Sequence, residues 1–294
     1  GSVLRRAGVV TDDYVRRSSK IVFRVSLPLL IFAKVEAHDP FEVPLGPASA
    51  FFAIATLVVF AGAWILAARL LPNRPSRGAA VQGCFRSNIG IIGLPVVANM
   101  LGEDGLAPAV MLFALAMPLY NVLAVLALSL TSDVSRRPRA GRVVADIARN
   151  PLIIAVAAGL AASHLPFDLP QVAIRTVESL AQLTFPLALL GVGASLTRTM
   201  LASKARPALA VGLVKTVLLP LGACTAAYLL GVRGSMLAIL FVVAGTPTAV
   251  SSFIMADAMG SDGELAAGIV FTSTLMALPT LFVGILVLRL IGAI

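Results

Sequence analysis

Two segments, far apart in the chain, combine polar side chains with glycine and proline inside long apolar runs. The first is Arg86–Pro95 (RSNIGIIGLP) and the second is Val242–Thr248 (VVAGTPT). Proline lacks a backbone N–H and clashes with the carbonyl four residues earlier, so each segment is predicted to break a helix and to free the carbonyls of Ile91 and Val243. A helix that restarts after a break presents free N–H groups and the positive end of its dipole, which suit an anion.

The polar groups at these breaks are the candidate binding residues. The amide of Asn88 offers a donor and an acceptor to a substrate, and capping of the freed backbone is the alternative role. Hydroxyls in membrane helices usually bond to their own backbone, which leaves a structural role open for the serines and threonines. One proline kink is ordinary in a membrane helix, whereas two kinks flanked by polar side chains favour a site. The predicted substrate-binding set is Asn88, Gly90, Gly93, Pro95, Thr246, Pro247, Thr248, Ser251 and Lys215.

Three bases stand inside the apolar runs that carry or adjoin these segments. Lys215 lies about 12 Å into its run, too deep for its side chain to reach the membrane surface easily. A buried base in a membrane is a functional hypothesis by default, and two roles stay open: counter-charge to a carboxylate, or tie to a freed carbonyl. Arg24 and Arg86 stand nearer the predicted cytoplasmic face, so we expect both side chains to extend to the membrane surface.

These segments belong to a chain that is predicted to cross a membrane many times. Of its 294 residues, 59% are hydrophobic and only 13% are charged. This is about half the charged share of soluble domains, which excludes a soluble domain, a disordered chain and a coiled coil. The apolar runs are too long for barrel strands, so an all-α membrane protein is expected. Nine spans are predicted: Ile21–Val35, Val43–Ala68, Gly78–Gly102, Gly105–Ser132, Asn150–Phe167, Ser179–Thr197, Pro207–Val232, Gly234–Ala256 and Leu265–Leu288, with breaks at Gly90–Pro95 and Gly245–Thr248.

The net charge of +9 comes from short basic clusters between the apolar runs, so a membrane accounts for it better than nucleic acid does. Sixteen Lys and Arg residues fall on connections that share a side with the N-terminus, and three fall on the opposite side. Because cytoplasmic loops carry the excess of bases, we expect a multi-pass protein of the cell inner (plasma) membrane. Its N-terminus is predicted to be cytoplasmic and its C-terminus external.

The second half of the chain echoes the first. Pro28 and Pro95 are 67 residues apart, and Pro186 and Pro247 are 61 residues apart, each in a similar local sequence. A turn of glycine followed by an acid comes after each break. Matched spans are five apart, which is an odd number, so the two copies should have opposite orientations, as in many secondary transporters. The predicted units are a first repeat at 1–132, a cytoplasmic basic linker at 133–149 and a second repeat at 150–294.

The chain resembles a bacterial member of the auxin efflux carrier family, within the wider bile acid/sodium symporter-like group. The resemblance rests on four stretches: Leu27–Phe32 (LPLLIF), Arg86–Pro95, Val214–Pro220 (VKTVLLP) and Gly245–Ala256 (GTPTAVSSFIMA). It implies ten helices in two inverted five-helix repeats, so one helix of the first repeat is expected to be missing here. It also implies two broken helices that cross and hold the substrate, with the residue equivalent to Asn88 in contact with it.

The same resemblance implies a division of labour between two parts of the fold. The scaffold part would comprise about 12–36 and 147–199, and the transport part about 43–132 and 203–294. It implies a homodimer formed through span one (about Val15–Glu36) and span six (about Pro170–Thr197). Bacterial members are associated with malonate, malate and similar acids, and plant members export auxin, which is also a carboxylate.

The sequence therefore predicts a carrier that moves a small organic anion, such as a carboxylate, by alternating access. A channel and a membrane sensor that binds a solute without moving it are the alternatives. An enzyme is not expected, because the chain has no histidine at depth and neither a His-Glu-x-x-His nor a Gly-x-Ser-x-Gly pattern. Cys84 and Cys224 lie in apolar runs and suggest neither a metal site nor a disulfide. The expected partners are the anion, the lipid bilayer and a second copy of the chain, with no metal, cofactor or nucleic acid.

Overall fold

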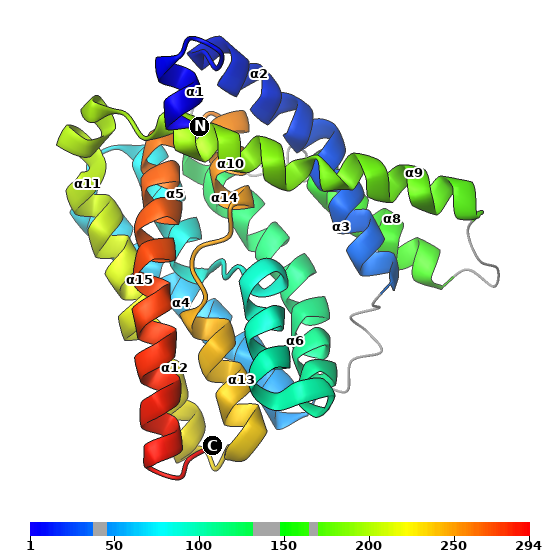
Figure 1. Cartoon of the computed structure of the whole chain (residues 1–294), viewed down its shortest axis with the longest axis vertical. Coiled ribbons are helices and arrows are strands. Elements are labelled where there is room, and N and C mark those ends of the chain that lie inside the picture. The colour runs from blue at the N-terminus through cyan, green and yellow to red at the C-terminus, as the bar shows by residue number, and fades with distance from the viewer. Residues whose placement is uncertain (38–45, 132–147, 165–169) are drawn as a thin grey trace.

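The computed structural model of the chain describes residues 1–37, 46–131, 148–164 and 170–294 (Figure 1). It is 86% helical, and the described residues form no strand beyond one isolated bridge. This confirms the all-α membrane fold. Five helices are long and apolar enough to cross a membrane: Pro47–Leu70, Gly105–Thr131, Gln171–Ser195, Ala202–Leu229 and Gly263–Leu290.

The helices follow the predicted spans closely, and π-helical turns (η) join several of them. The first half contains α1 (Ser2–Arg6), α2 (Asp12–Ile21), η1 (Val22–Ser26), α3 (Leu27–Ala37), α4 (Pro47–Leu70), α5 (Arg74–Phe85), η2 (Ile89–Gly93) and α6 (Leu94–Thr131). The second half contains α8 (Pro151–Ser163), α9 (Gln171–Gln182), α10 (Thr184–Ser195), α11 (Arg198–Leu213), η3 (Val214–Leu218), α12 (Leu219–Leu229), α13 (Gly234–Gly245), α14 (Ser251–Ala258) and α15 (Gly263–Leu290).

The two predicted glycine turns are present at matching places in the two halves. Gly102 (φ 67°) separates the two segments of α6, and Gly260 (φ 72°) lies between α14 and α15. Both angles are left-handed, a conformation that glycine adopts without the steric cost of a Cβ atom. The two related repeats and their inverted orientation stay predictions.

The helices pack as two groups, which meet through α14 and also directly where α10 packs against α15 and α6 packs against α3 and α8. In one group α3 packs against α8 and α9, and α2 packs against α10. In the other, α11 packs against α15, α4 and α6 pack against α5, and α12 packs against α13. Figure 1 shows α3, α8 and α9 together at one side of the molecule and α11, α12, α13 and α15 at the other. The short helix α14 contacts α2, α10 and η1 as well as α5, α6 and α15, so it lies where the groups meet.

Several of the predicted cytoplasmic bases meet at one end of the molecule. Arg5, Arg16, Arg74 and Lys204 come from four different helices, and all line a polar cavity of about 770 Å³, here called the end cavity. This agrees with the prediction that their segments share one side of a membrane. Figure 1 shows the chain termini at opposite ends of the long axis. The predicted basic linker, 133–149, lies almost entirely outside the described residues.

Asp262, at the wall of the end cavity, connects three helices. Its Oδ2 atom accepts hydrogen bonds from Lys204 Nζ on α11 and Ser76 Oγ on α5, both at 2.6 Å. Its Oδ1 atom accepts from the backbone N–H of Leu265 at 3.0 Å and so caps α15. Burial by itself would raise the pKa of this carboxyl, but the three donors and the positive charge of Lys204 hold the pKa below its ordinary value of 3.8.

We expect Asp262→Asn to lower the free energy of unfolding by about 1–2 kcal/mol, because a charge-assisted contact to Lys204 is lost. The contribution of a carboxyl whose pKa is lowered by folding is fully present above its ordinary value and disappears as the pH falls through the lowered value. The difference between the parent and the variant should therefore be constant above about pH 4 and shrink below it. Thermal unfolding in detergent over a pH series measures this, with Glu264→Gln as an exposed control. An equal difference at every pH would contradict the assignment.

Candidate functional site

Both predicted helix breaks exist, but the first lies earlier than expected. Residues Arg86–Asn88 are non-helical, whereas Gly90 lies in η2 and Pro95 in the first turn of α6. The prediction of a break at Gly90–Pro95 is therefore wrong by about four residues. A π-helical turn accommodates the proline locally, as neighbouring groups do in other membrane helices. The break falls instead where backbone from the other half of the chain supplies hydrogen-bond partners.

The second break covers Thr246–Val250, close to the predicted Gly245–Thr248, and the helix restarts at Ser251 rather than at Pro247. The first half-helix likewise restarts at Ile89 rather than at Pro95. Proline therefore marks each break without being the first residue of the helix that follows. In both breaks the non-helical residues bond to the opposite segment, Asn88 to the Pro247 carbonyl and Ala249 to the Arg86 carbonyl.

The two breaks are hydrogen-bonded to each other. Ser87 and Thr248 form an isolated antiparallel bridge. Within it the Asn88 N–H donates to the Pro247 carbonyl, and the Ala249 N–H donates to the Arg86 carbonyl, both at 2.9 Å. These bonds join residues about 160 positions apart in the chain. The backbone groups freed by the breaks therefore satisfy one another, which fixes the two segments side by side in the interior.

Side chains satisfy further carbonyls at the breaks. The Thr246 hydroxyl donates to the Val243 carbonyl at 3.0 Å, which is the carbonyl predicted to be freed by proline. The Thr248 hydroxyl donates across the bridge to the Gly83 carbonyl on α5 at 2.7 Å. Both threonines are buried. The Thr246 hydroxyl therefore satisfies its own helix end, and the Thr248 hydroxyl joins the second break to α5, the helix that precedes the first break.

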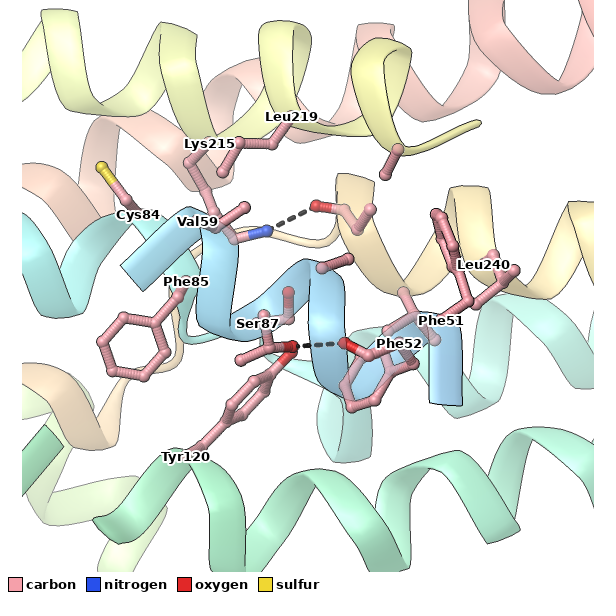
Figure 2. A pocket seen from close by; sticks show the side chains of 15 residues that line it. Phe51, Phe52, Val59, Cys84, Phe85, Ser87, Tyr120, Lys215, Leu219 and Leu240 are labelled. Carbon is pink, nitrogen blue, oxygen red and sulfur yellow. Dashed lines mark hydrogen bonds between the residues drawn. The ribbon is translucent and has the colours of Figure 1, made fainter. Parts of the chain in front are cut away.

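Two roles were open for Lys215, tie to a freed carbonyl and counter-charge to a carboxylate, and the structure shows the first. The side chain of Lys215 is only 1% exposed, and its ammonium donates to the carbonyl of Ala244, near the end of α13. It lines a small cavity of about 60 Å³ whose wall includes Ser87 and Tyr120. Figure 2 shows Lys215 and Tyr120 reaching this cavity from opposite sides. Its second open role, counter-charge to an anion, stays a prediction.

Arg86 does not extend to the membrane surface. It is 4% exposed, and its guanidinium donates to the side chains of Asn121 (2.8 Å) and Gln82 (3.4 Å) and to the sulfur of Met255. The expectation for Arg86 was wrong because its helix ends one residue earlier, which lets the side chain fold inward. Arg24 is exposed, as expected. All acceptors of Arg86 are neutral, and within the described ranges the ion pairs lie elsewhere, so its charge is not balanced by a carboxylate.

A larger cavity, here called the central cavity, lies beside the first break and has a volume of about 260 Å³. Its wall comes from α3, η2, α6, α10 and the break before α14. The polar residues that line it are Lys34, Arg86, Ser87, Asn88, Tyr120 and Ser251. The apolar residues around them include Leu27, Ile31, Phe113, Met117 and Phe185. A mostly apolar pocket with a few converging polar groups is the usual form of a small-molecule site.

Three members of the predicted set, Asn88, Gly90 and Ser251, line the central cavity. The side-chain amide of Asn88 is buried and has no hydrogen-bond partner among the described residues, so it is free to meet a ligand. Gly93 instead contacts the second break, since a Cβ there would lie 3.3 Å from the Thr246 methyl group. The other members that do not line this cavity are Pro95, Thr246, Pro247, Thr248 and Lys215.

Sequence reasoning missed two bases of the central cavity, Arg86 and Lys34. Arg86 directly precedes the Ser87–Asn88 pair, and this adjacency was the available signal. Lys34 is an exposed base on α3, at the opposite wall, and nothing in its local sequence pointed to the cavity. Among the described residues, no three His, Cys, Asp or Glu side chains gather as a metal ion would require. The two cysteines are buried and unpaired.

Comparison with known proteins finds relatives that are named as transporters. The chain is 27% identical over 278 residues to a protein of Rhizobium meliloti named "Putative malonate transporter", covering 92% of this chain and 85% of that protein. It is 22% identical over 280 residues to an uncharacterized transporter of Methanocaldococcus jannaschii, covering 92% and 89%. It is 23% identical over 289 residues to an uncharacterized transporter of Methanothermobacter thermautotrophicus, covering 96% and 91%.

The profile of one protein family, described as membrane transport protein, matches residues 2–133 and 140–285, which is nearly the whole chain. The family consists of transporters rather than enzymes. The chain therefore belongs to the membrane transport protein family, that of the auxin efflux carriers.

Proposed function

We propose that this transporter carries a small organic anion, of the carboxylate class, across the cytoplasmic (inner) membrane by alternating access. The observation that carries the proposal is the pair Arg86 and Asn88 in the wall of the central cavity. The first is a buried cation whose acceptors are neutral, and the second is a buried amide with no partner among the described residues. An anion in the cavity would balance the charge of Arg86 and would give the Asn88 amide a hydrogen-bond partner.

The charge of the central cavity supports an anion rather than a cation as the substrate. Arg86 and Lys34 both line the central cavity, and none of its lining residues is Asp or Glu. A cation would meet repulsion there, whereas a carboxylate would gain charge-assisted hydrogen bonds from a planar guanidinium. The start of η2 at Ile89 adds backbone N–H groups and a positive dipole end beside Asn88.

Size favours a small anion. A volume of about 260 Å³ corresponds to the space of roughly eight or nine water molecules at about 30 Å³ each. A dicarboxylate of three or four carbons has a similar number of heavy atoms and would fill it. The name of the Rhizobium relative, a malonate transporter, points to the same class.

The position of the central cavity suits alternating access. Its wall combines α3 and α10 from one helix group with η2, α6 and Ser251 from the other, so the ligand would contact both groups. We propose that these groups are the scaffold part (about 12–36 and 147–199) and the transport part (about 43–132 and 203–294). Relative movement of the two would open the cavity to one face of the membrane at a time.

We also propose that two copies pair through the scaffold helices, with the N-terminus cytoplasmic. The outer surface of α9 and α10 carries exposed apolar side chains, including Val172, Leu183 and Leu189. Lipid covers such a surface equally well, so the family resemblance carries this part. A monomeric mass both in detergent and in lipid nanodiscs would contradict the dimer.

We expect Asn88→Ala to weaken carboxylate binding by about 1–3 kcal/mol, or roughly 5–150-fold, because the carboxylate loses a buried hydrogen-bond partner. Calorimetry of malonate binding in detergent measures the change. Asn99→Ala is the matched control, since Asn99 stands on α6, is exposed, and its side chain donates to the Pro95 carbonyl. Equal losses in the two variants would reject Asn88 as a binding residue.

Uptake of labelled malonate into proteoliposomes tests the function itself. A carrier gives saturable uptake, competition by other small carboxylates and none by their neutral diamides. Flux that rises without saturation would indicate a channel. Binding without uptake would indicate a sensor.

A further inference from the structure

Asp257, near the end of α14, is a carboxylate that the anion site does not use. It lines the end cavity, whereas Ser251, at the start of the same helix, lines the central cavity. The two residues are six positions apart, which is about 9 Å along a helix. The short helix α14 therefore connects a site open to the polar end of the molecule with the proposed anion site.

The surroundings of Asp257 satisfy its charge only in part. Its Oδ2 atom is buried and has no hydrogen-bond partner among the described residues. On the side of α2, the Ser19 hydroxyl interacts with the carboxyl, and the charges of Lys20 and Arg16 attract it. On the other side Gly263 packs closely, since a Cβ there would lie 3.1 Å from Oδ1. A buried carboxylate oxygen without a donor favours the neutral, protonated form.

Asp262 provides the contrast within the same cavity. Both of its oxygens accept hydrogen bonds, and it holds together helices of one group. Asp257 instead lies on α14 and faces α2, so its charge acts between the two groups. A proton on Asp257 would remove the attraction between α14 and the bases of α2.

Asp257 differs in its environment from the other charged groups around it. The helix α10, which also packs on α14, carries no charged residue, and η1 carries only the exposed Arg24. The charged residues that face Asp257 or share its cavity are Arg5, Arg16, Lys20, Arg74, Lys204, Asp262 and Glu264. Of the two other acids, Asp262 accepts hydrogen bonds on both carboxylate oxygens, and Glu264 is exposed.

We infer that Asp257 is a proton-binding site that couples proton movement to substrate movement, as a symport. This inference rests on the proposed function, because the anion is the second species that is transported. An anion beside Ser251 and a charged Asp257 would be like charges about 9 Å apart on one helix. The anion therefore favours the protonated carboxyl, and by reciprocity the proton favours anion binding. The proton adds to the carboxylate from water in the end cavity, and it is released to water on the other side of the membrane after the two helix groups have moved relative to each other.

The coupling is tested in proteoliposomes with a pH gradient and the membrane potential clamped at zero. With one proton per anion, the parent protein should accumulate malonate about tenfold for each pH unit. Asp257→Asn should still exchange internal for external malonate but accumulate none. Asp257→Glu should restore accumulation, and Glu264→Gln should leave it unchanged. Full accumulation by Asp257→Asn would overturn the inference.

A second measurement does not depend on the anion. Hydrogen exchange of the backbone amides of α2 and α14, corrected for the intrinsic pH dependence, should increase in the parent as the pH falls. In Asp257→Asn the corrected exchange should be high at every pH, and in Asp257→Glu it should titrate again. Parent-like titration in the Asn variant would overturn the proton site. A parent that titrates but transports no carboxylate would instead reject the proposed substrate class and leave the proton site supported.

Discussion

Arg86→Gln is expected to lower the affinity for a dicarboxylate by about 10–100-fold and so to reduce uptake to roughly 2–20% of the parent's at substrate concentrations that half-saturate the parent. The buried guanidinium has only neutral acceptors, so its charge is available to the ligand. A charge-assisted hydrogen bond is worth about 1.5–3 kcal/mol, which corresponds to this loss. Glutamine keeps a polar group in reach of Asn121 while removing the charge. Calorimetry and the stabilisation of the protein by malonate against heat measure the effect.

Two further variants separate charge from position. Arg86→Lys keeps the charge but loses the planar fork, so it should bind more weakly than the parent and more tightly than Arg86→Gln. Lys215→Met removes the other buried base, which lines a separate small cavity and bonds to the Ala244 carbonyl. If Lys215 serves only its bond to the Ala244 carbonyl, the variant should leave the ratio of dianion to monoanion affinity unchanged, whereas if Lys215 is also a counter-charge, the variant should bind dianions less well than monoanions. A loss of dianion preference in Lys215→Met but not in Arg86→Gln would exchange the roles of the two bases.

The second large effect is on folding. Thr248→Val should lower the free energy of unfolding by about 1–3 kcal/mol, because the Gly83 carbonyl on α5 is left buried without its donor at 2.7 Å. Valine has nearly the same shape, so packing should be little changed. The lost bond joins the two halves of the chain at the bridge. A fall of several degrees in the thermal midpoint is expected for a chain of this size.

Thr216→Val is the matched control for that variant. Thr216 is also buried, but its hydroxyl donates to the Gly212 carbonyl one turn earlier in its own helix. Such a bond back to the same helix contributes little to stability, so the thermal midpoint should hardly move. If the two variants lose equal stability, the bond from Thr248 across the breaks contributes no more to stability than the bond from Thr216 within its own helix. Differential scanning fluorimetry in one detergent suffices for the comparison.

The fold class, the spans and the existence of two breaks could be predicted because each depends on local sequence. A run of about 20 apolar residues is stable across a membrane only as a helix, whatever its neighbours are. Proline frees a carbonyl in its own helix, so Pro95 and Pro247 indicate that each of their helices is interrupted before any packing is known, although only Pro247 lies within the observed break. The left-handed turns at Gly102 and Gly260 are local in the same sense. The motif that carries the family resemblance also lies in continuous sequence.

The exact position of the first break was not local. Its bonds come from Pro247 and Ala249, about 160 residues away, and these partners move the break to Arg86–Asn88. Long-range hydrogen bonds also determine which of the predicted site side chains already have a partner within the protein. The Thr248 hydroxyl is engaged by Gly83, while Asn88, also at the bridge, keeps its amide free for the cavity. Sequence alone leaves a structural role and a substrate-binding role open for both Thr248 and Asn88.

The sequence by itself determined that this protein is a helical membrane transporter with paired broken helices. Only the tertiary structure decided which charges face which cavity. Arg86 could extend to the surface or fold inward, and a helix that ends at Phe85 makes it fold inward. Asp257 has nothing unusual in its local sequence, yet packing against α2 and Gly263 leaves one of its oxygens buried without a partner. The physical reason is that hydropathy and proline act within one helix, whereas the environment of a charge is made by the several helices that surround it.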